Sequence, residues 1–194
     1  MAARKEADMI WYEYINAIGQ DSHRFEQTNE EDSDNRKNTR LILGGFEIPG
    51  GTPLKANSDG DVLLHALTNA ISGITCVNVL GAEADRLCLE EGVRDSSEYV
   101  KLALGSMHGI RITHVSFSVE CKTPKLSPHI ENIRECVADL LGITPDSVGI
   151  TATSGEGLSA FGKGEGIMVF CSVTARRAYG DDPYRQTEEG LPEL

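Results

Sequence analysis

The chain has 194 residues and a formal net charge of −12, with 40% hydrophobic and 25% charged residues. This length suits one domain with a substantial core, because a domain of this size buries roughly 70% of the surface of its unfolded chain. The acidic balance argues against DNA or RNA as a partner, since phosphate backbones require clustered lysine and arginine. An anionic substrate would need positive charge from elsewhere, and bound metal ions are the obvious source.

The apolar and cysteine residues are distributed as in a cytoplasmic protein that does not enter a membrane. Residues 1–19 include Lys5, Glu6 and Asp8, which interrupt any apolar run of the kind a secretion signal needs. The longest apolar run, at 167–171, is far shorter than the roughly 20 residues that cross a bilayer. Five cysteines stand singly without a CxxC pair, which is typical of reduced thiols in the cytoplasm.

The composition along the chain indicates one domain with polar ends. We expect residues 1–17 to form an N-terminal extension, 18–178 a single domain, and 179–194 an acidic tail. Residues 26–40 are almost wholly polar and predict a surface loop within that domain. No internal repeat or domain linker is visible.

Strand and helix signals alternate through the domain. Apolar and polar residues alternate over 113–120, which is typical of a half-buried strand. Three further segments predict strands, namely 41–48, 148–153 and 165–175. Residues 130–141 predict a helix between Pro128, which is tolerated at a helix start, and Gly142, which suits a left-handed cap. The expected fold class is α/β (α+β), a two-layer sandwich in which helices cover one face of a mixed sheet.

The stretch SDGD at 58–61 precedes another predicted helix. Ser58 and Asp61 have the spacing of a capping box, and an acidic first turn suits the helix dipole. His65 lies on a different side of this helix from the apolar residues that we expect to be buried, which are Leu63, Leu67, Ala70 and Ile71. The polar residues therefore have two interpretations, as a helix cap or as part of a binding site.

A second polar stretch, GQDSHRF at 19–25, contains a DxH pair. In an extended segment Asp21 and His23 point the same way, so a carboxylate and an imidazole can bind one cation. His65 is a candidate third ligand, and zinc with three such ligands keeps a fourth position open for substrate. A DxH pair is also a common surface feature, so the spacing alone leaves both interpretations open.

The stretch TATSGEGLSAFGKGEG at 151–166 follows a predicted strand. Its glycines allow backbone N–H groups to approach an anion, and Thr153 and Ser154 can donate hydrogen bonds to phosphate oxygens. Glu156 could hold a magnesium ion. The same residues also suit a tight turn between strands.

A fourth stretch, KTPKLSPHI at 122–130, places Lys125 between two prolines. Such a rigid loop can form the wall of a pocket for a planar base. It can equally serve as a stiff connection between a strand and a helix.

Together and in this order, the four stretches resemble the 2-C-methyl-D-erythritol 2,4-cyclodiphosphate synthase family of non-mevalonate isoprenoid biosynthesis. The resemblance covers about residues 18–175, and SDGDxxLHAL is its most specific part. It implies conversion of 4-diphosphocytidyl-2-C-methyl-D-erythritol 2-phosphate, a cytidine diphosphate-linked small molecule, into the cyclic diphosphate and CMP. It also implies a homotrimer with active sites between adjacent subunits.

The resemblance implies two metal sites. Asp21, His23 and His65 match the ligands of Zn²⁺ or another divalent transition metal. Glu156 matches the residue that binds Mg²⁺ or Mn²⁺. These ions would supply the positive charge that this acidic chain lacks.

The resemblance also implies which residues contact the substrate. Asn57 and Ser154 match catalytic positions at the reacting phosphates, where the family commonly has His and Thr, and both keep hydrogen-bonding groups. Lys163 matches a basic position near the trimer axis. The other substrate-binding positions are Ser58, Asp85, Cys121, Thr123, Lys125, Leu126, Ser127, Ala152 and Thr153.

Residues 77–97 depart from the family pattern, because they lack the loops that hold the erythritol hydroxyls. Val79 falls where the first aspartate would stand, and we expect Asp85 or Glu83 to take its place. Three functions remain open: an active synthase, a non-catalytic metal-loaded trimer that binds cytidine or isoprenoid diphosphates, and a zinc-dependent phosphoesterase. The phosphoesterase would need a base to activate water, and none is evident beyond His108, His114 and His129.

Overall fold

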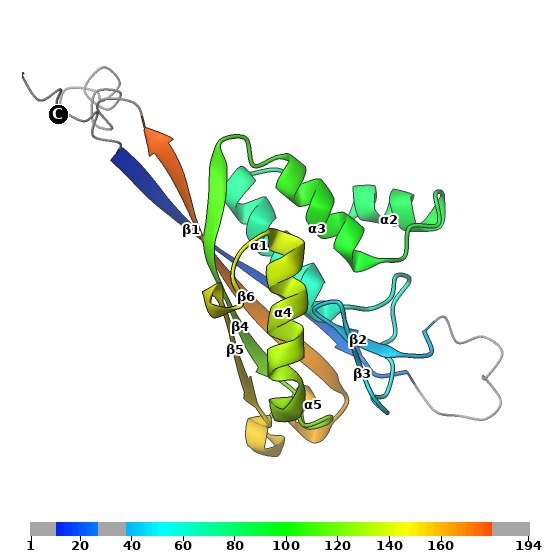
Figure 1. The fold of residues 1–194 in the computed structure, drawn as a ribbon. Coiled ribbons are helices and arrows are strands. Elements are labelled where there is room, and N and C mark those ends of the chain that lie inside the picture. Colours follow the sequence, from blue (N-terminus) through cyan, green and yellow to red (C-terminus); the bar gives the residue numbers. More distant parts are fainter. Residues whose placement is uncertain (1–10, 27–37, 180–194) are drawn as a thin grey trace, which may run out of the picture.

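The computed structural model describes residues 11–26 and 38–179, which Figure 1 shows as a ribbon. The main sheet has the strand order β1 (Trp11–Arg24), β6 (Gly166–Tyr179), β4 (Ile110–Glu120) and β5 (Val148–Thr153). β6 is antiparallel to β1 and β4, whereas β5 is parallel to β4. The mixed sheet expected from the sequence is therefore confirmed.

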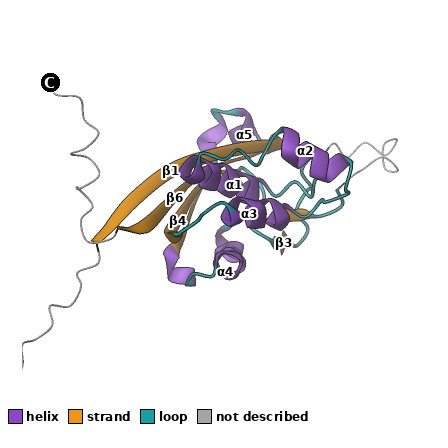
Figure 2. Cartoon of the chain, turned by 90° about the horizontal axis from the view of Figure 1, so that it is seen from above, coloured by secondary structure: helices purple, strands orange, loops and turns teal. Residues whose placement is uncertain are grey.

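The three longest helices, α1, α3 and α4, lie on one face of this sheet (Figure 2). α1 (Val62–Thr75) packs on β1 and β6, α4 (Ile130–Leu141) packs on β5, and α3 (Ser96–Gly105) packs on α1. The shorter helices are α2 (Ala82–Leu89), α5 (Ala160–Lys163) and the 3-10 turns η2 (Ser127–His129), η3 (Pro145–Ser147) and η4 (Gly155–Gly157). In the part of the chain that the structure describes, no helix is long and apolar enough to cross a membrane.

The hydrophobic core lies between the sheet and α1 and α4. The α1 side chains predicted to be buried are fully buried, and α4 ends at Gly142, which adopts the predicted left-handed conformation with φ of 64°. On the sheet side, Val115, Phe117 and Val119 of β4 are fully buried, in agreement with the alternating pattern of that strand. The core holds α1 against β1, and these two elements carry the candidate metal ligands.

One predicted strand is a hairpin instead. Residues 41–48 form β2 (Leu41–Leu43) and β3 (Phe46–Ile48), which pair with each other. Gly44 and Gly45 turn the chain between them at φ values of 62° and 81°, a conformation that glycine adopts without steric cost. The glycine pair in LILGGFEI was the signal for this turn.

The sheet begins earlier than we expected. Trp11 pairs with Tyr179, so β1 starts inside the segment 1–17 that was expected to be an extension. The expected polar loop and acidic tail fall mostly outside the described residues. At the described edge of that loop, Asn38 is buried and its side-chain amide donates a hydrogen bond to the Leu54 carbonyl at 2.9 Å, so this end of the loop is packed against the domain.

β1 and α1 approach each other closely at Gly19. A Cβ atom there would lie 2.1 Å from the carbonyl oxygen of Ala66 and 2.4 Å from the amide nitrogen of Ala70. We expect Gly19→Ala to lower the free energy of unfolding in urea by about 3 kcal/mol, because strand and helix must separate. Gly105→Ala is the control: nothing lies within 4 Å of its added Cβ, and it should be neutral or slightly stabilising. Equal effects of the two changes would contradict this packing.

Candidate active site

Asp21, His23 and His65 converge on one point. Asp21 Oδ2 lies 3.0 Å from both His23 Nε2 and His65 Nδ1, and the two ring nitrogens are 3.1 Å apart. Odd-numbered positions of β1 face α1, so Asp21 and His23 share the side that the spacing predicted. His65 reaches them from the first turn of α1. The side chains are 25%, 21% and 10% exposed, which leaves the cluster accessible from one side.

This triangle has the dimensions of a metal site. Ligand atoms around tetrahedral zinc, with bonds of 2.0–2.1 Å, are about 3.3 Å from one another, close to the observed separations. Burial alone would raise the pKa of Asp21, but hydrogen bonds and charge from His23 and His65 hold that pKa well below its usual range. Asp21 is therefore a carboxylate at neutral pH. Within the described ranges, these three residues are a group able to hold a metal ion.

Asp61 caps α1, which corrects the predicted capping box of Ser58 with Asp61. The Asp61 carboxylate accepts hydrogen bonds from four backbone N–H groups, those of Leu63 (3.1 Å), Leu64 (3.0 Å), Gly44 (2.8 Å) and Gly45 (2.7 Å). Burial and the nearby Asp59 raise the pKa of Asp61 to about 6, against the opposing effect of these N–H groups, so it is ionised at pH 7. Its role is structural, because it joins the β2–β3 turn to the start of α1.

A pocket of about 310 Å³ opens beside the triad. Asn57 and Ser58 line it together with the three candidate ligands, so the structure brings five of the predicted site residues to one place. The Ser58 hydroxyl lies 3.3 Å from His65 Nε2. This position suits a phosphate contact next to a metal ion.

The sequence reasoning missed another part of the lining of this pocket. It consists of Leu80, Gly81, Ala84, Cys88 and Tyr99. α2 occupies the segment where the family loops are lacking, and the helical spacing of its apolar residues was the available signal. The predicted Asp85 lies in α2, but its side chain falls outside what the structure describes.

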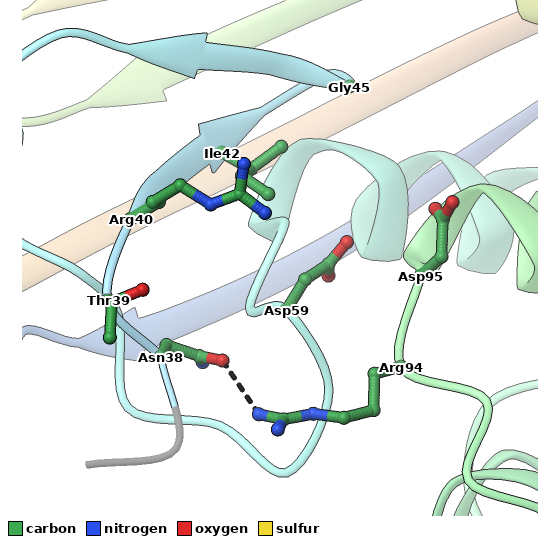
Figure 3. A pocket seen from close by; sticks show the side chains of 8 residues that line it. All are labelled: Asn38, Thr39, Arg40, Ile42, Gly45, Asp59, Arg94 and Asp95. Atoms are coloured by element: carbon green, nitrogen blue, oxygen red, sulfur yellow. Dashed lines mark hydrogen bonds between the residues drawn. The ribbon is translucent and has the colours of Figure 1, made fainter.

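A second cavity, of about 410 Å³, is bordered by Asp59 and by the two arginines Arg40 and Arg94 (Figure 3). Arg94 donates a hydrogen bond to Asn38 Oδ1 at 3.0 Å. None of the residues predicted to contact metal or substrate is among its described lining. This cavity is connected to the site through Asp59, whose carboxylate also accepts hydrogen bonds from Ser96 of α3.

Most of the remaining predicted contacts lie at or just after the carboxyl ends of β4 and β5, whereas Lys163 is the last residue of α5. The parallel register places Glu120 opposite Thr153, and the Cys121 N–H donates to the Thr153 carbonyl at 3.0 Å. The Cys121 thiol donates to the Thr123 carbonyl at 2.7 Å, and burial raises its pKa to about 11. Leu126 is buried, whereas the exposed members of this group are Thr123, Lys125, Ser127, Ala152, Thr153, Ser154 and Lys163.

We call these remaining contacts the second group, to distinguish them from the residues around the triad. Glu156 belongs to the second group and lies on a strained turn. Its φ is 49°, a left-handed value that is uncommon outside glycine and is often found at functional sites. Ser154 Oγ donates to its carboxylate at 3.1 Å, and the side chain is exposed. Among the described residues, no member of the second group lines the pocket of the triad. One chain therefore carries two separate halves of the predicted site.

Comparisons with known proteins agree with this geometry. The 2-C-methyl-D-erythritol 2,4-cyclodiphosphate synthase of Chlamydia muridarum is 45% identical over 162 residues, which cover 83% of this chain and 87% of the relative. A solved CDP-bound 2C-methyl-D-erythritol-2,4-cyclodiphosphate synthase superposes with a TM-score of 0.66 and 27% identity, over 82% of this chain and 98% of the other.

The bifunctional IspDF of Campylobacter jejuni superposes with a TM-score of 0.75 and 27% identity over 88% of this chain. This chain spans less than half of that longer protein, covering 44% of it. The YgbB family matches residues 15–176, which include the triad, the pocket and both strand ends. The chain therefore belongs to the YgbB family.

Proposed function

We infer that this protein is a 2-C-methyl-D-erythritol 2,4-cyclodiphosphate synthase, a lyase of non-mevalonate isoprenoid biosynthesis. The observation that carries this inference is the Asp21–His23–His65 triad facing an open pocket, in a chain 45% identical to a synthase. The substrate is 4-diphosphocytidyl-2-C-methyl-D-erythritol 2-phosphate, and the products are the cyclic diphosphate and CMP. The cysteine pattern, with five free thiols, supports a cytoplasmic location.

The chemistry is an intramolecular phosphoryl transfer. An oxygen of the 2-phosphate forms a bond to the β-phosphorus, and the bond from that phosphorus to the CMP oxygen breaks, so no water enters the product. A divalent ion at the triad would polarise the phosphate under attack. Asn57 and Ser58 border the same pocket and would orient the diphosphate through hydrogen bonds. The nucleophile is already an anion and needs no general base.

The second group would hold the leaving nucleotide. The loop from Cys121 to Ser127 and the strand end at Ala152 and Thr153 offer backbone and hydroxyl groups for cytidine and its phosphates. Glu156 presents an exposed carboxylate to Mg²⁺ or Mn²⁺, which would neutralise charge on the diphosphate. Ser154 positions that carboxylate through its hydrogen bond.

The two separate halves favour a homotrimer in which adjacent subunits complete each site. The sheet face away from the helices supports such an assembly, because it carries exposed apolar side chains: Tyr14 at 61%, Ile18 at 69% and Phe170 at 37%. Apolar surface of this kind is typical of a face that binds another subunit. The position of Lys163 near a trimer axis belongs to the same proposal.

Mixing two inactive variants tests the shared site. We expect His23→Ala and Glu156→Gln each to keep at most about 1% of wild-type activity separately, and to recover activity after the subunits are exchanged. In a randomly mixed ring, about a quarter of the sites combine an intact triad with an intact Glu156. Light scattering should give three times the mass of one chain. Mixtures that stay inactive despite exchange would contradict sites shared between subunits.

Glu156→Gln alone should reduce turnover by roughly 10²-fold or more, because the second ion loses its anionic ligand. The loss should be accompanied by a much higher Mg²⁺ requirement in a steady-state titration. Glu131→Gln is the control, since Glu131 is an exposed carboxylate on α4 that pairs with Arg134. A normal Mg²⁺ requirement in Glu156→Gln would remove Glu156 from the metal site.

The reaction itself is tested by measuring nucleotide release. Purified protein with the cytidyl substrate, Zn²⁺ and Mg²⁺ should release one CMP for each substrate consumed. A chelator should stop the release, and added metal should restore it. CMP release that is insensitive to chelation would contradict the proposed role of the triad.

A further inference from the structure

The ring nitrogen of His65 that faces away from the triad is held by a buried hydroxyl. Ser96 Oγ lies 2.9 Å from His65 Nε2, nearer than the Ser58 hydroxyl at 3.3 Å. Ser96 is the first residue of α3 and is completely buried. The other nitrogen of the ring, Nδ1, points at Asp21 and His23. Each nitrogen of His65 therefore has its own set of partners.

Asp59 determines the direction of the hydrogen bond between Ser96 and His65. The Ser96 hydroxyl donates to Asp59 Oδ1 at 2.5 Å, and the Ser96 N–H donates to Oδ2 at 3.0 Å. Oδ1 also accepts the N–H of Asp61 at 3.1 Å. A carboxylate only accepts, and a hydroxyl has one proton to give. Because that proton goes to Asp59, the Ser96 oxygen must accept from His65, and His65 therefore carries a proton on Nε2.

This arrangement turns His65 Nδ1 toward Asp21 and His23, so that Nδ1 is the ring nitrogen available to a metal ion. In the metal-free protein Nδ1 lies 3.0 Å from a carboxylate oxygen of Asp21, within hydrogen-bond distance. A metal ion between these two atoms would take the place of a proton there, since metals bind the unprotonated nitrogen of histidine. The contacts around Ser96 thus prepare His65 for metal before any metal arrives.

We propose that Ser96, held by Asp59, is a positioning residue that sets the metal-binding tautomer and ring orientation of His65. The proposal rests on the metal site of the proposed function and adds a residue that contacts neither metal nor substrate. Ser96 lies 31 residues from His65 and reaches it through the packing of α3 on α1. Groups that hold the second nitrogen of a ligand histidine commonly tune metal affinity.

Titration of the full-length protein with Co²⁺ tests this role. The visible absorbance of Co²⁺, read in competition with a chelator, gives the affinity of each variant. We expect Ser96→Ala to bind Co²⁺ about 10–100-fold more weakly than the wild type. Ser97→Ala is the matched control, because the neighbouring Ser97 hydroxyl lies outside the described contacts of His65 and Asp59. This substitution should leave the affinity unchanged.

Ser96→Thr separates positioning from stability. It keeps the hydroxyl but adds a methyl group at a fully buried position, so it should unfold at lower urea concentration than the wild type and still bind Co²⁺ nearly as tightly. Nitrogen-15 NMR of metal-free protein should show the His65 proton on Nε2 in the wild type and a loss of that preference in Ser96→Ala.

Two results would overturn the proposal alone: wild-type Co²⁺ affinity in Ser96→Ala, or a His65 ring without a proton on Nε2 in the metal-free wild type. A wild-type protein that binds no Co²⁺ would overturn the metal site as well. Weakened binding in both Ser96→Ala and Ser97→Ala would point to a general disturbance of α3 and would also count against the role of Ser96.

Discussion

Asp61→Ala should lower the free energy of unfolding by about 3–5 kcal/mol, one of the largest losses available to a single substitution in this chain. The carboxylate accepts hydrogen bonds from N–H groups of Gly44, Gly45, Leu63 and Leu64, and it is fully buried. Alanine would leave these groups without a partner and away from water. Urea denaturation at neutral pH, where the carboxylate is ionised, measures the effect.

Asp95→Ala is the matched control for this prediction. Asp95 is the N-cap of α3, but it is exposed, and its carboxylate accepts one described backbone hydrogen bond, from Ser97 at 2.8 Å. Loss of an ordinary cap costs about 1 kcal/mol. Equal losses of unfolding free energy in Asp61→Ala and Asp95→Ala would contradict the role of Asp61 in joining the β2–β3 turn to α1.

His23→Ala should lower kcat/KM by about 10³-fold or more, because a bound metal contributes several kcal/mol to the stabilisation of charge in the transition state. The Co²⁺ absorbance should be lost in the same variant. The midpoint of urea unfolding for the metal-free protein should change little, since His23 is partly exposed and lies at the edge of the core. Steady-state kinetics and metal titration on the same preparation measure both effects.

His114→Ala provides the comparison for His23→Ala. His114 is exposed on β4 and does not belong to the triad. The His114→Ala variant should therefore retain full activity and full metal binding. A His23→Ala variant that kept more than about a tenth of wild-type activity would be inconsistent with a catalytic metal at this triad, because a tenfold loss corresponds to only about 1.4 kcal/mol.

Local patterns in the sequence were sufficient for β4, β5 and β6 and for placing two of the candidate ligands on one side. The period of two in β1 places Asp21 and His23 on one side, and the helical period of α1 buries Leu63 and Leu67. These predictions depend only on neighbouring residues. The third ligand required the additional expectation that α1 packs on β1, which the close contact at Gly19 provides.

Long-range contacts account for what the sequence reasoning missed. Asp61 looked like a partner of Ser58, but its main partners include a turn that lies 16 and 17 residues earlier in the chain. Ser96 reaches His65 from another helix, and no local pattern connects them. α2 lies where the family resemblance failed, and the helical spacing of its apolar residues was a local signal that the sequence reasoning did not use.

Phosphorus NMR of the reaction mixture tests the central claim most directly. With wild-type protein, the cytidyl substrate, Zn²⁺ and Mg²⁺, we expect the signals of the cyclic diphosphate to appear together with an equal amount of CMP. CMP accompanied by an open-chain product would indicate hydrolysis by water, as in a phosphoesterase. Substrate that binds to the metal-loaded protein without any turnover would contradict the synthase and leave a binding protein.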